Sequence, residues 1–468
     1  MACQRSGLIT SLMTATLALG AAHPVTAEAK GKSKVAVASV FDAAKRKRTK
    51  HELTPNLSYS AYANARFLGE RDINRDDAIR DASDELGLYV GVVGRAQLSS
   101  RIMAFAHGEL SLKDKSTHAR SYGRIMDPRL KEALVAISIS DAVTVRVGRL
   151  RFSDKTKWVA DASVDGLHIA HKTNTRVLEF AALRGTEDNT STYVMAHMGR
   201  VDAAAHWGGL ALGEIDGDAK RLHLTGYYAT QTTRRFSYSV NVGAIWGDAA
   251  NGKRAGFGFD LRAVRKLGDH KLKPQLMFGL AYGSSGFQQS GLHSNKTYDG
   301  GQTQCHRYGF TTQAELTNIA VASVGVGIRP SRKMSADLIV SGFLQPSPIA
   351  TTTLGRIAGE TTGKSRFLGT EISAVGAYRP TKKTKFELGV GRIMPGPAYR
   401  DQSTTTRLFT RFSDYLRPFR KDLRYDPLYL TRQRSLAGTW NRTCARKRQR
   451  ALRRRGTGRC KLCPLHRI

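Results

Sequence analysis

A period-two alternation of apolar and polar residues recurs along residues 57–415, and it constrains the fold more than any other feature of the sequence. Segments of about ten residues alternate in this way, and clusters of Gly, Asp, Asn, Lys and Thr separate them. In one segment Val240, Asn241, Val242 and Gly243 follow one another. Because successive side chains of a strand point to opposite faces, each segment predicts a strand with one apolar and one polar face.

A strand of about ten residues, tilted by about 45°, is long enough to cross a bilayer. One face must then be apolar because it touches lipid, and the other face can be polar only where it lines water. We count about eighteen such segments, to within about two, which fits the even strand number of bacterial barrels. The sequence therefore predicts an all-β protein, a closed transmembrane antiparallel β-barrel of about 18 strands over residues 57–415.

Soluble all-β folds are the alternative. A β-solenoid needs a fixed repeat, which we do not find in the sequence, and a soluble β-sandwich would show shorter strands. The mean hydropathy of −0.36 is that of an ordinary soluble protein. It does not exclude a membrane barrel, because alternation keeps the average hydropathy of a barrel strand low even when one face lies in lipid.

The first residues are typical of a secretory signal peptide. Arg5 supplies a positive start, residues 8–22 form a short apolar run, and Ala27 ends a small-residue cleavage site. A membrane-spanning helix is the alternative, but it needs about 20 apolar residues. We therefore predict a cleaved signal peptide over residues 1–27, followed by a periplasmic N-terminal segment over residues 28–56.

Residues 416–468 leave the alternating pattern and form an extension that is rich in Arg and Lys. Cys444, Cys460, Cys463 and His466 lie in it, but their spacing is a weak signal because a zinc site needs four ligands at workable distances. A nucleic-acid-binding arm is a second interpretation, and a disordered or out-of-frame extension is a third. We favour the third and predict neither a metal site nor a nucleic-acid partner.

The whole chain is strongly basic, with 74 Lys and Arg against 38 Asp and Glu and a formal charge of +36. Such an imbalance predicts an anionic partner: nucleic acid, an anionic membrane surface or a polyanionic substrate. Enzyme motifs are missing from the sequence, including Gly-x-Ser-x-Gly, His-Glu-x-x-His and a phosphate-binding glycine loop. We therefore predict a protein that is not an enzyme and that uses no cofactor, with an outer-membrane barrel enzyme as the alternative of another class.

Basic residues recur on the polar face of the predicted strands. Their spacing from apolar neighbours predicts that the following point into the lumen: Arg66, Arg95, Arg101, Arg146, Arg221, Arg262, Arg329, Arg407 and Arg411. Arg149 and Arg151 join them only if a β-bulge near Gly148 resets the register. Arginine rings make a pore anion-selective, and a guanidinium can bind a carboxylate through two hydrogen bonds. Acids on the same face are expected to tether the arginines by ion pairs: Asp260, Glu315, Glu371 and Glu387.

Three stretches of the chain resemble the alginate export family of outer-membrane proteins. In the first, residues 147–152 are followed by Trp158 and by residues 164–167, similar to the family's Gly-Arg strand, aromatic residue and Asp-containing strand. Leu150 departs from the expected Gly-Arg-Gln. The third stretch lies near the end of the predicted barrel and comprises residues 368–372, 391–392 and 395–398.

The second stretch is the most specific. Residues 287–295, 307–309 and 315–319 are similar to the family's Phe-Arg-Gln-Thr-Gly-Leu, Arg-Tyr-Tyr-Gly and Glu-Leu-Ser-Asn-Leu. Gln288 stands where the family pattern has Arg, so one lumenal cation is lost there. The resemblance adds Arg307 to the expected polymer-binding residues and Asp165 to the lumenal acids.

The resemblance implies an eighteen-stranded barrel in the outer membrane of a Gram-negative bacterium, at the end of an alginate synthesis and secretion complex. Its partners would be alginate (polymannuronate and guluronate), outer-membrane lipid and periplasmic proteins of the secretion complex. Alginate carries a carboxylate on every sugar, which matches the inward arginines expected from the alternation. We therefore predict a passive, anion-selective conduit for alginate export, with a general anion or sugar-acid porin as the alternative.

Overall fold

The computed structural model describes residues 39–41, 51–72, 82–117, 121–154, 156–186, 189–202, 205–230, 235–249, 252–268, 270–297, 301–348, 351–352 and 359–416. The predicted signal peptide, and the basic extension after Leu416, lie outside the described residues. No helix in the described part of the chain is long and apolar enough to cross a membrane.

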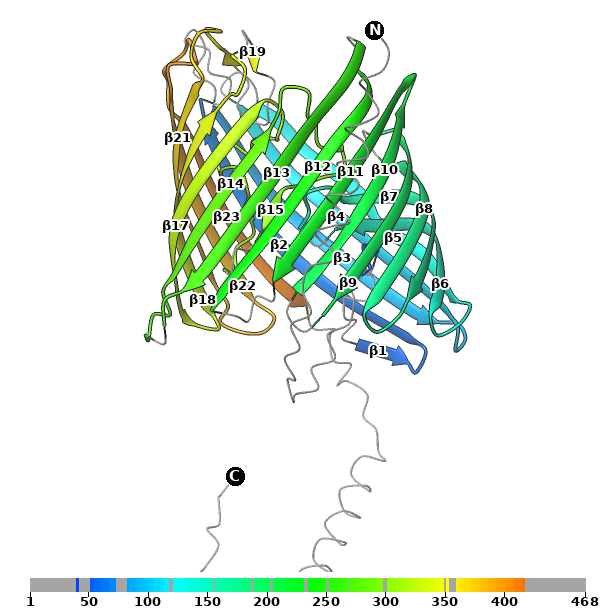
Figure 1. Ribbon diagram of the computed structural model, residues 1–468. Helices are drawn as coiled ribbons and strands as arrows, with labels where there is room; N and C mark the ends of the chain where they lie inside the picture. Colours follow the sequence, from blue (N-terminus) through cyan, green and yellow to red (C-terminus); the bar gives the residue numbers. More distant parts are fainter. Residues whose placement is uncertain are drawn as a thin grey trace, which may run out of the picture. The chain divides into compact units, whose positions relative to one another are not determined.

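Eighteen strands of the described chain form one closed antiparallel β-barrel (Figure 1). They are β2 (Leu57–Arg71), β3 (Ala82–Gln97), β4 (Ile102–Thr117), β5 (Ser121–Ser138), β6 (Val143–Ser153), β7 (Asp161–Lys172), β8 (Arg176–Gly185), β9 (Thr192–Val201), β10 (Ala205–Asp216), β11 (Ala219–Thr230), β12 (Phe236–Ala249), β13 (Gly252–Lys266), β14 (Gln275–Gly283), β17 (Ile319–Ser331), β18 (Met334–Leu344), β21 (Phe367–Tyr378), β22 (Lys385–Pro395) and β23 (Thr405–Leu416). This confirms the predicted closed antiparallel barrel of about 18 strands.

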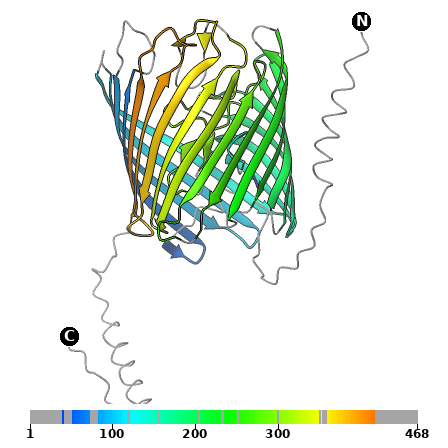
Figure 2. The same cartoon turned by 60° about the vertical axis from the view of Figure 1, so that its left-hand side comes forward.

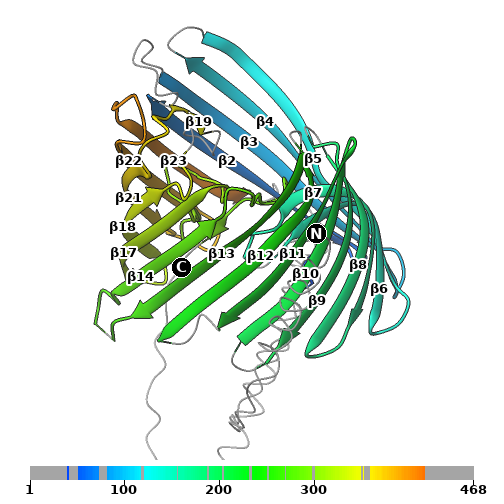
Figure 3. The same cartoon turned by 45° about the horizontal axis from the view of Figure 1, so that its top comes forward.

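The barrel closes between its first and last strands. β23 pairs with β2, with Ala61 opposite Leu416 and Arg71 opposite Thr406. Figures 2 and 3 show these two strands, blue and orange, side by side. Closure removes the free sheet edge that would otherwise expose unpaired backbone groups to lipid.

In the described ranges, five short strands lie outside the wall. β1 (His51–Thr54) pairs with the beginning of β2. β15 (Lys296–Thr297) pairs with β16 (Cys305–His306) in the long segment between β14 and β17. β19 (Thr351–Thr352) pairs with β20 (Gly359–Glu360) between β18 and β21.

The two faces of the wall are inverted relative to a soluble protein. On β8, Leu178 and Phe180 are 44% and 52% exposed, whereas Glu179 between them is fully buried. The same alternation runs along β3, where Leu88 and Val90 are exposed and Val93 is buried on the opposite face. Apolar side chains therefore cover the outside, where they contact lipid, while the inward positions hold polar side chains together with apolar ones that pack inside the barrel.

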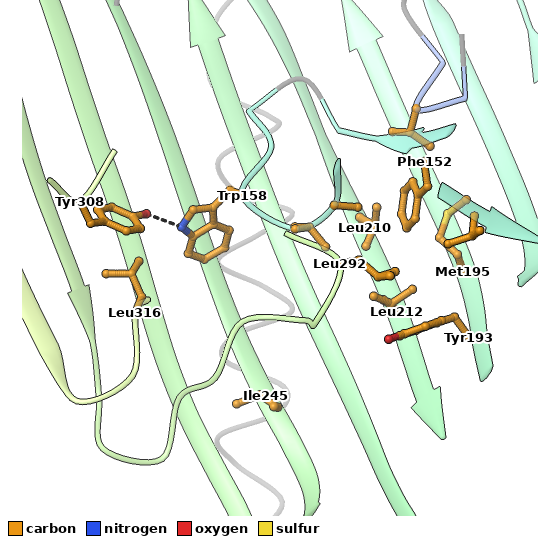
Figure 4. Close-up of a cluster of buried hydrophobic side chains, with 14 of the residues drawn as sticks. Phe152, Trp158, Tyr193, Met195, Leu210, Leu212, Ile245, Leu292, Tyr308 and Leu316 are labelled. Atoms are coloured by element: carbon orange, nitrogen blue, oxygen red, sulfur yellow. Dashed lines mark hydrogen bonds between the residues drawn. The ribbon is translucent and has the colours of Figure 1, made fainter. Parts of the chain in front are cut away.

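Inside the barrel lie residues 284–297 and 301–318, the described parts of the connection from β14 to β17. Tyr308 and Leu316 of this segment, which we call the inner loop, are buried within the barrel, as is Trp158 from the connection between β6 and β7 (Figure 4). The largest hydrophobic cluster of the described chain thus includes a loop packed against the inner wall. What remains of the lumen is shaped by the inner loop and not by the strands alone.

Candidate functional site: the barrel interior

A buried arginine of the inner loop binds it to the wall. Arg307 donates a hydrogen bond from Nη1 to Oδ1 of Asp260 on β13 at 2.9 Å, and from Nη2 to the carbonyl oxygen of Thr156 at 2.8 Å. Arg262, also on β13, donates to the carbonyl oxygen of Arg307 at 2.9 Å. Charge-assisted hydrogen bonds of this kind are among the stronger polar contacts in proteins. Arg262 and Arg307 therefore attach the inner loop to strand β13.

Glu371 on β21 holds the next residues of the inner loop. Its carboxylate accepts hydrogen bonds from the backbone nitrogens of Phe310 at 2.6 Å, Thr311 at 3.0 Å and Thr312 at 2.9 Å. Arg407 on β23 donates to the carbonyl oxygen of Phe310 at 2.9 Å. One buried carboxylate therefore satisfies three successive N–H groups that the loop would otherwise leave unpaired.

The inner loop also contacts the connection between β6 and β7. The Trp158 indole donates to the Tyr308 hydroxyl oxygen at 2.8 Å, as Figure 4 shows, and Gln289 donates to the Trp158 carbonyl oxygen at 2.9 Å. Asp161 donates its backbone N–H to the carbonyl oxygen of Leu292 at 2.7 Å. The loop is consequently attached to β6–β7, to β13 and to β21–β23, which are separate parts of the wall.

Cations gather around one point of the inner loop. Lys296 remains accessible to solvent although barrel atoms surround it. Burial lowers the pKa of its ammonium group; Asp161 opposes that effect, while the positive charges of Lys157, Arg411 and Arg151 lower the pKa further. Residues from β6, from β23 and from the connection between β6 and β7 therefore place positive charge near the same side chain.

His306 lies in the same cationic surroundings. Its Nδ1 accepts the backbone N–H of Tyr308 at 3.3 Å, which requires an unprotonated Nδ1. Burial lowers the pKa of His306 well below its usual value, and the nearby charges of Lys296, Arg407 and Arg262 add to this. The ring is therefore neutral near pH 7 and contributes no charge to the interior.

Most inward arginines of the wall are tethered by acids. Arg329 binds Asp337 at 2.6 Å, Arg407 lies 3.3 Å from Glu70, Arg411 lies 3.7 Å from Glu387, and Arg66 pairs with Glu85. Arg221 also contacts Glu214 at 3.3 Å. Such pairs fix the positions of the guanidinium groups and weaken the attraction that each one exerts alone.

Arg146 belongs to a buried polar chain on β6–β9. Its Nη1 lies 2.9 Å from Nδ1 of His168, and Nε2 of His168 lies 3.0 Å from Oε1 of Glu179. Nδ1 of His197 lies 2.6 Å from Oε2 of the same carboxylate. Because a guanidinium only donates, Nδ1 of His168 must accept and its Nε2 must donate to Glu179. The sequence pattern predicted Arg146 in the lumen but identified neither Glu179 nor a role for His168.

Two predicted lumenal residues face outward instead. Strand pairing continues through Gly148 without a shift of register, so the proposed reset does not occur. Arg149 therefore shares a face with Val147, which is exposed on the outside, and stands opposite Asp165. Arg149 binds Asp165 through two hydrogen bonds of 2.8 and 2.9 Å. The predictions of a lumenal Arg149 and a lumenal Asp165 are corrected, because an unbroken alternation carries both to the outer face.

The predictions of a lumenal Arg101 and a lumenal Arg151 also need correction. Arg101 lies in the exposed turn before β4 and not on a strand, because β3 ends at Gln97 and β4 begins at Ile102. Arg151 lies near the end of β6, where it binds Asp161 at 2.6 Å, and this carboxylate also accepts a hydrogen bond from Ser294 of the inner loop. Because the register is not reset, Arg151 shares the face of Arg149 and not that of the inward Leu150, so the prediction of a lumenal Arg151 is corrected as well; Asp161 links it to the loop.

Of the remaining predicted residues, Arg95 lies on a wall strand and Glu315 lies in the inner loop. Arg95 on β3 stands opposite Phe105, whose side chain is buried on the inward face. Glu315 belongs to the inner loop, with its carboxylate 3.8 Å from His293 and nearly half of its side chain exposed. Neither of them joins the contacts that fix the loop to the wall through Arg307 and Glu371.

A family model described as alginate export matches residues 129–411, well over half of the chain. The chain belongs to the alginate export family. The matched range begins in β5, ends in β23 and contains the inner loop, so the alginate export family match covers most of the wall together with that loop. No match was found among functionally curated protein sequences.

Solved structures with the same fold are porin-like outer-membrane barrels. Pseudomonas aeruginosa OccK7 (OpdD) is 10% identical with a TM-score of 0.53 and covers 78% of this chain and 99% of its own. Acinetobacter baumannii OccAB4 is 8% identical with a TM-score of 0.52, covering 78% and 99%. Pseudomonas aeruginosa OccK2 (OpdF) in complex with glucuronate is 10% identical with a TM-score of 0.50, covering 77% and 98%. At such identities the likeness establishes the fold alone.

The two departures from the expected family pattern are accounted for locally. Leu150 points inward and is buried in the hydrophobic cluster that packs the inner loop. Gln288 accepts a hydrogen bond from Arg254 on β13. At these positions an apolar contact and an amide–guanidinium contact replace the Gln and Arg that the alginate export pattern led us to expect.

Proposed function

We propose that this barrel is a passive, anion-selective outer-membrane channel that exports alginate. The observation that carries the proposal is the cationic surroundings of the solvent-accessible Lys296, to which the inward Arg411 of β23 contributes. Membership of the alginate export family supports the choice of polymer. A polyuronate has one carboxylate on each sugar, so several weak cationic contacts would attract it without holding it.

The tethered arginines fit transport better than capture. A polymer passes through a channel only if each binding position also releases it, and a carboxylate beside each guanidinium weakens the grip. Arg411 beside Glu387 and Arg66 beside Glu85 are of this kind. No chemical step is required of these residues, and we propose that the protein is not an enzyme. A cleaved signal peptide, contact with outer-membrane lipid and docking to periplasmic secretion proteins complete the proposal.

Planar-bilayer recordings test it. The purified full chain should conduct anions in preference to cations, and short mannuronate oligomers should block the current from either side. Neutral maltooligosaccharides of equal length serve as the control and should leave the current unchanged. Cation selectivity, or equal block by the neutral sugars, would contradict alginate export.

A second candidate is a porin for small sugar acids. It is favoured by the amount of lumen that the inner loop fills, and by the likeness to OccK2, whose structure holds glucuronate. Expression in an alginate-producing strain that lacks its own export barrel separates the two functions. Restored polymer secretion supports export, whereas uronate uptake without secretion supports the small-molecule porin.

A further inference from the structure

A short piece of the N-terminal region lies inside the barrel. Ser39, Val40 and Phe41 are at most 6% exposed, although β1, ten residues further on, pairs only with the beginning of β2. The backbone N–H of Ser153 on β6 donates to the carbonyl oxygen of Val40 at 2.9 Å. These three residues therefore contact the inner wall well away from the point at which the chain enters the barrel sheet.

The wall offers these residues a built polar site. Ser39 donates its hydroxyl to Oε1 of Glu179, and the Val40 N–H donates to Oε2 of the same carboxylate at 3.2 Å. Glu179 is fully buried on β8, with His168 and His197 completing its hydrogen bonds. The carboxylate thus has histidine donors on the wall side and the N-terminal segment on the other.

An aromatic contact adds to the polar one. The ring of Phe41 stacks on Phe152 of β6, with centroids 5.0 Å apart and planes inclined by 15°, and its centroid lies 4.2 Å from that of His168. Burial of a phenyl ring against two other rings is favourable in water-filled surroundings. We define the seat by its four wall residues: Phe152, Ser153, His168 and Glu179.

We propose that Ser39–Phe41 are a lumenal latch, a segment of the chain's own N-terminal region that occupies the seat and narrows the channel until it is released. The latch forms no strand of the wall: its backbone hydrogen bond to the wall ladder is the one from Ser153, beyond Arg149, where the pairing of β6 with β5 ends. No strand pairing of the wall runs through these three residues, so the latch can leave while the wall stays folded. The inference rests on the proposed channel function and adds a means of controlling it.

Bilayer conductance of the full-length protein tests the latch. Replacing residues 39–41 by three glycines should raise single-channel conductance at least about twofold, because it removes a phenyl ring from the lumen. Phe41→Ala and Glu179→Gln should each give part of this rise. Leu53→Ala on β1, where the side chain is 62% exposed, is the matched control and should conduct like the wild type. Heat-modifiable migration on gels checks that every variant folds.

A peptide with the sequence of residues 36–44 supplies the second measurement. Added to the glycine variant it should lower the conductance toward the wild-type level, whereas the same peptide with Ser39→Ala and Phe41→Ala should not. Wild-type conductance in the glycine variant, or equal effects of the two peptides, would overturn the latch. If anion selectivity persists in that case, only the latch fails. If the channel prefers cations but its conductance still depends on the latch, the proposed function is contradicted and the latch is not.

Discussion

At the scale of single residues, the interior is organised by carboxylates that accept several hydrogen bonds at once. Glu371 accepts three backbone N–H groups of the inner loop, and Glu179 accepts two histidines together with the N-terminal segment. A buried carboxylate is stable only with such partners. Each of these two carboxylates therefore fixes a segment of the chain inside the barrel: Glu371 fixes the inner loop, and Glu179 fixes the N-terminal segment.

Glu371→Ala tests the first of these carboxylates. The change leaves three buried N–H groups without an acceptor, and we expect it to lower the free energy of unfolding by about 3 kcal/mol. Thermal unfolding in detergent, followed by circular dichroism, measures the loss. Glu360→Ala is the control, because Glu360 and Arg400 form an exposed ion pair whose side chains are 73% and 66% exposed. Equal stability of the two variants would show that Glu371 does not fix the loop.

Arg411→Glu tests the charge of the lumen. Arg411 lies among the cations around Lys296, and its side chain is 37% exposed, so reversing its charge should reduce anion preference without unfolding the barrel. Reversal potentials in a salt gradient measure the preference. Arg400→Glu, in the exposed connection after β22, is the matched reversal and should leave the reversal potential unchanged. An unaltered potential in the Arg411 variant would place the selectivity elsewhere.

His306 gives the inner loop a dependence on pH. Its pKa is held well below 6.5, so below that pH the unfolded chain takes up a proton that the folded chain resists. Stability should therefore be complete above pH 6.5 and fall as the pH drops, by up to about 1.4 kcal/mol per pH unit. Melting temperatures at pH 7.5 and 5.5 should differ less in His306→Gln than in the wild type. His171→Gln, at an exposed strand position, should retain the wild-type difference.

At the scale of elements, the strands were predictable and the inner loop was not. Alternation predicts the polar-face positions of Arg66 and Arg407 because a strand has a fixed period, and without an assumed bulge it puts Arg149 on the face of Val147. The position of the inner loop depends on partners far along the chain, such as Asp260 and Glu371. A carboxylate between Leu178 and Phe180 was the one local signal for Glu179, since it marks an inward polar position.

Shortening the inner loop tests its role as an element. Replacing residues 288–315 by a short Gly-Ser linker should raise conductance severalfold while the barrel still forms. The expected reason is that the loop fills the interior, whereas the wall strands pair with one another without it. Conductance and heat-modifiable migration measure the two parts. Replacing residues 353–358 by the same number of Gly and Ser residues is the control, because it changes a different connection. A barrel that no longer forms would show that the loop builds the wall as well.

At the scale of the whole molecule, the wall is complete at Leu416, since residues 406–416 pair with residues 61–71. Truncation after Leu416 should therefore leave a heat-modifiable barrel with wild-type anion selectivity. Nucleic-acid binding by the full chain that disappears on truncation would revive the alternative of a nucleic-acid-binding arm. Failure of the truncated chain to assemble would show that residues after Leu416 are needed to build the barrel.

The pairing of β2 with β23 also sets the order in which the molecule can be made. Each internal strand finds its neighbours among residues synthesised shortly before or after it, but β2 must wait for the last strand of the wall. Until then both terminal strands present unpaired backbone edges to their surroundings. Before the last strand is added, the sheet is therefore open and prone to aggregate through its edges. We expect chaperones to shield those edges until β23 pairs with β2.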